Sequence, residues 1–334
     1  MANIKDIDLV VHHNVEDLFT VVGASEENIE RLDSAPYSYW RETFKQLLKR
    51  PLAIVSIIVV ILLVLFTIFG PMIHSFNVDL SKPNVDRFEE YLPPNAVNWF
   101  GTGGAKMINF KKLDLWTCVW KGSQLSLIIG VVVALIDTSL GIFIGALWGY
   151  FRKLDPIMIE IRNFVNNVPG LLLYFLLMQI LNPQTTMEYF WTLIFVLTMF
   201  GWLGLASFIR NQIIIIRNRE YNVASQTLGT SSKNMITHNL LPYLISVIVT
   251  DVSTAIPAAI SSEVGLAFFG LSFNAAKGDI TLGQLLTEAT QDDWMTPSHF
   301  YLLLVPMIVL VPLTVSFFYL GLVLSDVTDP KNHR

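Results

Sequence analysis

The sequence predicts an all-α integral membrane protein with six transmembrane helices. About 53% of its 334 residues are hydrophobic and only 15% are charged, whereas a soluble domain carries roughly 25% charged residues. The mean hydropathy is +0.52, so the chain cannot cover a soluble surface with polar side chains. A net charge of −5 argues against nucleic-acid binding, and a single cysteine excludes an internal disulfide scaffold.

Six apolar runs are long enough to cross a bilayer, because about 20 helical residues span the hydrocarbon core. The runs cover residues 52–70, 125–150, 164–181, 189–209, 241–262 and 300–324. The first begins at Leu52, too far into the chain for a cleavable signal peptide. The third contains Pro169 and Gly170, and the fifth contains Asp251, so these two runs are the least regular.

Basic residues orient the runs. Thirteen lysine and arginine residues fall on one side if both termini are cytoplasmic, whereas 182–188 has none and 263–299 has only Lys277. Residues 71–123 hold six basic residues that five acidic residues nearly balance. Because basic residues favour the cytoplasmic side of short loops, we expect cytoplasmic N and C termini in the plasma membrane.

The remaining segments follow from this topology. Residues 1–36 form an acidic cytoplasmic tail, and 325–334 form a second cytoplasmic tail. We expect 37–51 to be an interfacial helix, because aromatic and apolar residues recur there at helical spacing beside a basic stripe; a plain extension of the first span is the alternative. Residues 71–123 form an extracytoplasmic loop, and 124–324 form the transmembrane core.

The stretch 217–241 between the fourth and fifth runs predicts a helical hairpin. Gly229 suits the left-handed conformation that ends a helix, and Ser231 or Thr230 suits the cap of the next one. Pro242 fits the first turn of the fifth span. The small residues before Gly229 would let another protein approach the backbone closely, although an ordinary helical connector explains the pattern equally well.

This hairpin resembles the EAA loop of ABC importer permeases, in which Glu-Ala-Ala precedes a glycine and a Leu-Pro pair at fixed spacing. Ala224-Ser225, Gly229 and Leu241-Pro242 match. Val223 replaces the usual glutamate and Asn239 replaces the usual isoleucine.

The resemblance continues in register from about residue 37 to 330, and it indicates the C-type permease subunit of the oligopeptide/dipeptide transport group (the OppC, DppC and AmiD type). The matching stretches are Trp99-Phe100-Gly101-Thr102, 114–127, 141–151, 169–172, 262–271, 282–286 and 326–330. Residues 103–113 depart from the family pattern. The resemblance implies the type I ABC importer permease fold, with an N-terminal interfacial helix and a cytoplasmic coupling helix.

The resemblance also implies roles for residues. The coupling hairpin would dock onto an ATPase subunit through Glu220, Tyr221, Ala224, Ser225, Leu228, Gly229, Thr230, Ser231, Leu241 and Pro242. The chain itself would not hydrolyse ATP, since it has no Walker A pattern. It would be a non-catalytic subunit that binds no cofactor or metal. Two ATPase subunits would bind ATP and Mg. A homologous B-type permease would complete the oligopeptide path, and an extracytoplasmic lipid-anchored binding protein would deliver the peptide.

Polar residues inside the runs are costly in lipid unless they face the bundle or water. We expect Asp251, Ser253, Thr254, Asp137 and Asn167 to line the translocation path. Interhelical hydrogen bonding, worth about 0.6 kcal/mol on average, is the competing explanation. Glu263 would instead fix the segment after the fifth span.

Three alternative functions remain. The same fold would also suit import of dipeptides, nickel or another small solute. An autonomous secondary transporter is disfavoured because no internal repeat is visible. A membrane-embedded enzyme is disfavoured because the sequence lacks a His/Glu cluster and a Gly-x-Ser-x-Gly motif.

Overall fold

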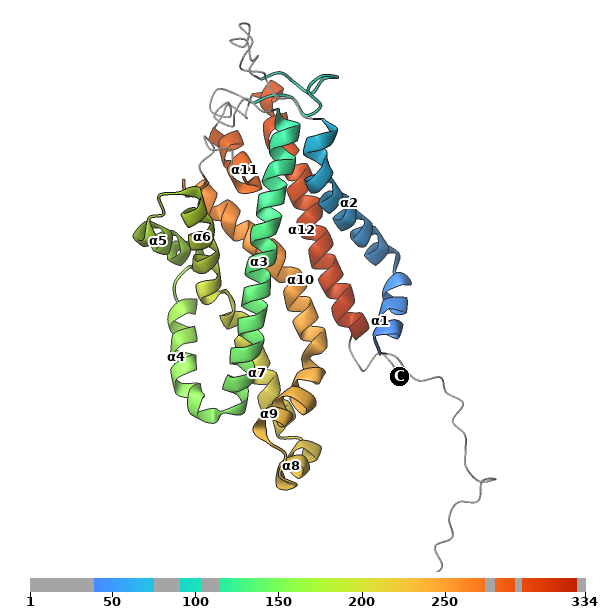
Figure 1. The fold of residues 1–334 in the computed structure, drawn as a ribbon, viewed down its shortest axis with the longest axis vertical. Coiled ribbons are helices and arrows are strands. Elements are labelled where there is room, and N and C mark those ends of the chain that lie inside the picture. Colours follow the sequence, from blue (N-terminus) through green and yellow to red (C-terminus); the bar gives the residue numbers. More distant parts are fainter. Residues whose placement is uncertain (1–38, 75–90, 104–113, 274–279, 292–295, 329–334) are drawn as a thin grey trace, which may run out of the picture. The chain divides into compact units, whose positions relative to one another are not determined.

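The computed structural model describes residues 39–74, 91–103, 114–273, 280–291 and 296–328, and these contain helices and loops but no strand (Figure 1). Contacts divide the chain into two units, Met1–Glu42 and Thr43–Arg334. In the first unit only residues 39–42 are described, so the fold is that of the second unit. The predicted tails 1–36 and 325–334 lie wholly or largely outside the described residues, as do 75–90 and 104–113 of the predicted outer loop.

The helices form in chain order. They are α1 (Tyr39–Leu48), α2 (Pro51–Ile73), α3 (Leu115–Tyr150), η4 (Arg152–Leu154), α4 (Asp155–Asn166), α5 (Gly170–Leu181), α6 (Thr186–Gly201), α7 (Leu203–Arg217), α8 (Glu220–Thr227), α9 (Ser232–Asn234), η5 (Met235–Leu240), η6 (Leu241–Leu244), α10 (Ile245–Phe268), α11 (Leu282–Gln291), η8 (Pro297–His299) and α12 (Tyr301–Thr328).

Five helical stretches are long and apolar enough to cross a membrane. They are Pro51–Ile73, Leu115–Tyr150, Thr186–Arg217, Val247–Phe268 and Pro297–Thr328. The predicted third span is not one straight helix, because Arg152–Asn166 and Gly170–Leu181 meet at 90°. Pro169 stands at the bend; it donates no backbone hydrogen bond, and it pushes the preceding residue out of the helical region. Counting the bent pair as one span gives the six that were predicted.

Other boundaries also differ from the prediction. α3 begins at Leu115, inside the predicted loop 71–123, because Asp114 caps its first turn by accepting a hydrogen bond from the Thr117 amide at 3.2 Å. The fourth span is interrupted at Trp202, where α6 ends and α7 begins. The α-helix of the fifth span begins at Ile245 rather than Leu241, because a short 3₁₀ helix precedes it.

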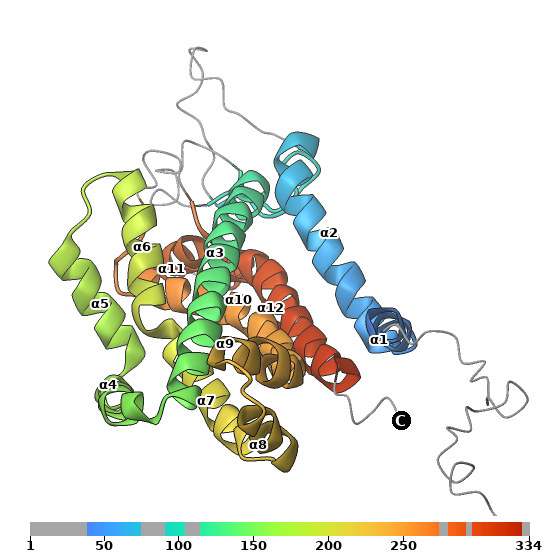
Figure 2. The same ribbon diagram turned by 60° about the horizontal axis from the view of Figure 1, so that its bottom comes forward.

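α3 packs most extensively against α7, and Figures 1 and 2 show the two helices side by side. Three glycines on one face of α3 permit this approach. A Cβ atom at Gly141 would lie 2.8 Å from Leu205, one at Gly145 would lie 2.7 Å from the Ala206 carbonyl oxygen, and one at Gly149 would lie 2.8 Å from Ile213. Small residues at this spacing allow close packing of helices in membranes. Such packing matters there because the hydrophobic effect does not drive helices together in lipid.

An aromatic cluster fixes the end of α3 that lies away from α8. Trp116 and Trp120 of α3 pack with Phe66, Trp99 and Phe100. The Trp116 indole donates to the Gly70 carbonyl oxygen at 2.7 Å, which ties α2 to α3. The cluster therefore orders the described loop residues 91–103 against the helices.

Gly101 makes the turn within this cluster. Its φ is +80°, and a Cβ there would lie 2.5 Å from the Leu92 carbonyl oxygen. The neighbouring Thr102 carbonyl accepts a hydrogen bond from the Tyr301 hydroxyl at 2.6 Å. The Trp-Phe-Gly-Thr stretch thus has a packing role that connects the loop to α12.

We expect Gly145→Ala to lower thermal stability, because the new methyl group meets α7 backbone that cannot move independently. Overpacking of this kind costs about 1–3 kcal/mol. Gly204→Ala is the matched control, since nothing lies within 4 Å of a Cβ at Gly204. Thermal unfolding in detergent should show a lower midpoint for Gly145→Ala only; equal midpoints would contradict the close α3–α7 contact.

Candidate coupling hairpin and intramembrane cavity

The predicted hairpin is present at the end of α7. α8 ends at Thr227, and Gly229 has a φ of +87°, as the predicted helix stop requires. Ser231 caps α9 by accepting from the Asn234 amide at 3.4 Å. The second half differs from the predicted α-helix, because a single turn of α9 leads into the π-helix η5 and the 3₁₀ helix η6.

Pro242 gives a physical reason for this irregularity. It lies in η6 and not in the first turn of an α-helical fifth span. A proline cannot donate to the carbonyl four residues back, and its ring displaces that carbonyl. Wider and tighter turns accommodate such a break.

A buried polar network holds the two halves of the hairpin together. Asn222 is fully buried, and its side-chain amide donates to the Ile216 carbonyl oxygen at 2.9 Å. The Asn239 amide donates to Asn222 Oδ1 and to Ser225 Oγ, both at 3.4 Å. Ser225 and Thr230 share a hydrogen bond of 2.8 Å. Asn239, one of the two departures from the EAA pattern, therefore bridges α8 and η5.

The hairpin exposes three apolar side chains on α8 and its C-cap. Leu228 is 87% exposed, and Tyr221 and Val223 are each nearly half exposed. Tyr221, Ala224 and Leu228 are spaced so that they share one helical face. We call these three residues the hairpin face. Among the other predicted coupling residues, Glu220, Gly229, Ser231 and Pro242 are exposed, whereas Ser225, Thr230 and Leu241 are partly buried.

Two arginines tie the hairpin end of α7 to neighbouring helices. Arg210 pairs with Asp155 of α4 at 2.8 Å and lies over the Trp148 ring, whose indole also donates to Asp155 at 2.8 Å. Arg217 donates to the Tyr150 carbonyl oxygen at 2.5 Å. These contacts were not predicted from the sequence, because Arg210 and Asp155 are 55 positions apart. They connect any movement of the hairpin to α3 and α4.

A polar cavity of about 320 Å³ lies between α3, α5, α6–α7 and α10. Asp137, Asp251 and Thr254, three of the predicted path residues, line it together with Tyr174 and Ser262. The described residues that line it include no lysine, arginine or histidine.

Gly201 makes room for one of these acids. A Cβ at Gly201 would lie 2.1 Å from Asp137 Oδ2, so any larger residue at 201 would require the carboxylate to move. Asp137 Oδ1 is buried and accepts no hydrogen bond from the described residues.

The other two predicted path residues lie elsewhere. Ser253 packs against α12, since a Cβ atom added at Gly321 of α12 would lie 2.8 Å from the Ser253 Cβ. The Ser253 hydroxyl donates to the Val249 carbonyl oxygen at 2.9 Å. Asn167 is the C-cap of α4 and is exposed. The structure thus brings three of the five predicted residues together.

Glu263 forms a separate buried cluster. Its carboxylate accepts from the Thr281 hydroxyl at 2.5 Å and from the Ser126 hydroxyl at 3.4 Å. Ser126 in turn accepts from the Leu282 amide at 3.0 Å. A Cβ at Gly283 would lie 2.9 Å from the carboxylate. Glu263 therefore joins α10, α3 and the start of α11, in agreement with the expectation that it fixes the segment after the fifth span.

The described part of the chain does not gather the side chains that a metal site needs. No group of three or more His, Cys, Asp or Glu side chains there is arranged to hold a metal ion.

Comparison with known proteins identifies the family. Residues 140–332 match the binding-protein-dependent transport system inner membrane component, and 38–94 match the N-terminal transmembrane domain of oligopeptide transport permease C. The chain is 35% identical to the oligopeptide transport system permease protein AmiD of Streptococcus pneumoniae, over 96% of this chain and 98% of that one. It is 31% identical to the dipeptide transport system permease protein DppC of Bacillus subtilis, over 97% and 96% respectively. The chain therefore belongs to the binding-protein-dependent inner membrane components, the permease family of ABC importers.

Proposed function

We propose that this chain is one of two permease subunits of an ATP-driven importer of oligopeptides. The observation that carries the proposal is the hairpin: an exposed apolar face on a segment whose interior is held by a buried polar network. Relatives named as oligopeptide permeases, AmiD among them, supply the cargo class. The family is a membrane component and is not itself catalytic, so the energy comes from partner subunits.

In this proposal, two ATPase subunits bind ATP with Mg and close on each other, and one of them carries the hairpin face with it. The buried Asn222 makes the hairpin move as one body with the end of α7. Arg217 and Arg210 then transmit the movement to α3 and α4. The hairpin lies on the cytoplasmic side, with both termini cytoplasmic in the plasma membrane.

The path for the peptide would form between this chain and a homologous B-type permease. The cavity at Asp137 and Asp251 is its proposed contribution, because two acids and several hydroxyl groups line it. A lipid-anchored binding protein would deliver peptide from the other side. Identity to DppC makes dipeptides the alternative cargo, and uptake assays with peptides of defined length separate the two.

We predict that Leu228→Asp weakens ATPase binding by about 30-fold, since a central apolar contact is worth about 2 kcal/mol or more. Gln226→Asp is the control, because Gln226 is also exposed on α8 but lies outside the hairpin face. Copurification of the ATPase subunits and peptide-stimulated ATP hydrolysis should both fall in Leu228→Asp only. Peptide uptake that persists without any ATPase subunit would refute the coupling proposal.

Substitution of Gly229 should act through its backbone alone, because no atom lies within 4 Å of a Cβ there. Gly229→Ala places alanine in the left-handed region at a cost of about 1–2 kcal/mol. Gly229→Asn should behave like the wild type, since asparagine tolerates that region. We expect reduced peptide-stimulated ATP hydrolysis in Gly229→Ala and near-normal hydrolysis in Gly229→Asn. Equal activity in all three proteins would exclude a role for this turn.

The cavity is tested by cysteine labelling. Asp251→Cys should react with a water-soluble thiol reagent in at least one nucleotide state, because position 251 faces the cavity. Ser253→Cys should be protected, since it packs on α12. Background labelling should be low, as the single native cysteine, Cys118, is buried. Complete protection of Asp251→Cys in every state would remove the cavity from the path.

A further inference from the structure

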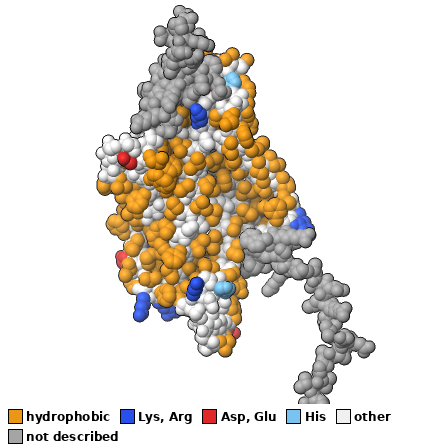
Figure 3. Space-filling view, viewed as in Figure 1, with side chains coloured by type: hydrophobic (Ala, Val, Ile, Leu, Met, Phe, Trp, Pro, Cys, Tyr) orange, Lys and Arg blue, Asp and Glu red, His pale blue; other side chains and the backbone are white. Residues whose placement is uncertain are grey.

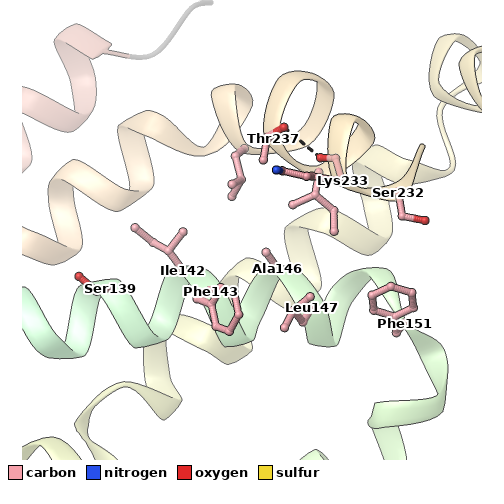
Figure 4. Close-up of a pocket in the computed structure, with 11 residues that line it drawn as sticks. Ser139, Ile142, Phe143, Ala146, Leu147, Phe151, Ser232, Lys233 and Thr237 are labelled. Carbon is pink, nitrogen blue, oxygen red and sulfur yellow. Dashed lines mark hydrogen bonds between the residues drawn. The ribbon is translucent and has the colours of Figure 1, made fainter. Parts of the chain in front are cut away.

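A second cavity lies on another face of α3, near the hairpin. It has a volume of about 560 Å³, within the range of about 300–1,000 Å³ that is typical of ligand pockets. Its walls come from α3 on one side and from α9, η5 and the start of η6 on the other (Figure 4). We call it the α3 groove. Its apolar lining residues are Ile142, Phe143, Ala146, Leu147, Phe151, Ile236 and Leu241.

The α3 groove continues a line of apolar side chains exposed along the membrane-spanning part of α3. Ile128, Val131, Leu135 and Phe143 follow one another at helical spacing, and Phe143 is 64% exposed. Figure 3 shows a broad hydrophobic face over this side, with lysine and arginine side chains gathered toward its lower end. Because apolar side chains dominate this face, the groove suits an apolar occupant. The polar cavity at Asp137 shares none of its lining residues.

One charged side chain interrupts the apolar lining. Lys233 of α9 borders the groove beside Ser232, and Figure 4 shows its side chain extending along the hairpin toward Thr237, at the edge of the groove. No acidic side chain lines the groove, and within the described residues Lys233 forms no ion pair. Arg152 and Lys153 follow α3 at the same end and are exposed. Neither of these two residues lines the groove, so the groove combines an apolar channel with one positive charge, that of Lys233.

We propose that the α3 groove holds one phospholipid with an anionic headgroup. An acyl chain lies along Phe143 and Leu147, and the headgroup phosphate pairs with the Lys233 ammonium. Basic pockets between membrane helices on the cytoplasmic side suit such headgroups. An acyl chain matches the apolar wall of the groove, and the negatively charged phosphate provides an ion-pair partner for the Lys233 ammonium. The inference depends on the membrane location of the chain and not on the cargo of the transporter.

Lipid retention tests this proposal. The full-length protein, with the subunits that copurify, is reconstituted in nanodiscs of equal parts phosphatidylglycerol and phosphatidylcholine, extracted, and analysed by native mass spectrometry. Wild type should retain phosphatidylglycerol preferentially. Lys233→Gln should reduce that preference about fivefold, as expected for one basic side chain near the surface. Lys153→Gln, which makes the same charge change at the same end, should retain the wild-type preference. An unchanged preference in Lys233→Gln would overturn the proposal.

A second pair of variants tests the apolar part. Ser139→Trp should fill the groove, since Ser139 is exposed and lines it, and should abolish retention of the bound lipid. Leu135→Trp changes the same face of α3 outside the groove and should not. If Ser139→Trp or Lys233→Gln instead releases a second protein chain while lipid retention is unchanged, the groove is a protein interface and the proposal is wrong.

A measurement on the unmodified protein covers the case in which a variant fails to fold. A phosphatidylglycerol with a photoreactive group in the middle of one acyl chain should crosslink to the α3 segment 142–151. Crosslinks that never include this segment would overturn the assignment of the groove to lipid.

Discussion

The close contact between α3 and α7 is the constraint on which the other features depend. Gly141, Gly145 and Gly149 bring the two backbones within van der Waals distance, which leaves no space for a side chain between them. In a membrane, helices associate through such packing because lipid and side chains are equally apolar. α7 leads directly into the hairpin, so its position against α3 determines where the hairpin stands. The same approach places Asp137 of α3 beside Gly201 at the end of α6.

Polar contacts at both ends of α3 then hold the neighbouring helices in the arrangement that the glycines permit. At one end, Arg210, Asp155 and Trp148 join α7, α4 and α3. At the other end, the Glu263 carboxylate joins α10 to α3 and to the start of α11. A buried carboxylate is costly unless its oxygens are satisfied, and two hydroxyl groups meet that need here. Between the two ends, Asp137 Oδ1 at the cavity has no hydrogen-bond partner among the described residues, so this carboxylate is not fixed as Glu263 is.

The sequence predicted the helices well where length and composition decide the outcome. Apolar runs locate the spans because the bilayer thickness sets their length, and Gly229 was identifiable because its spacing from Pro242 matched a known loop. The 90° bend at Pro169 was not predicted, since a proline in a membrane helix also permits a mild kink. Pairing of Arg210 with Asp155 depends on tertiary packing. Gly141, Gly145 and Gly149 form a visible pattern of small residues at intervals of four. A single sequence, however, does not indicate which helix packs against this pattern.

The two departures from the EAA pattern have different physical consequences. Asn239 is partly buried and bonds to Asn222 and Ser225 inside the hairpin, so its polar side chain is compensated by polar neighbours on α8. An isoleucine there would leave the buried Asn222 oxygen without this donor, and the replacement therefore belongs to the internal structure of the hairpin. Val223 is nearly half exposed on α8, so this departure changes the surface that the hairpin presents. In the proposed transporter, the ATPase subunit that fits this chain must accept an apolar surface at that position, because no carboxylate is present to pair with a basic side chain.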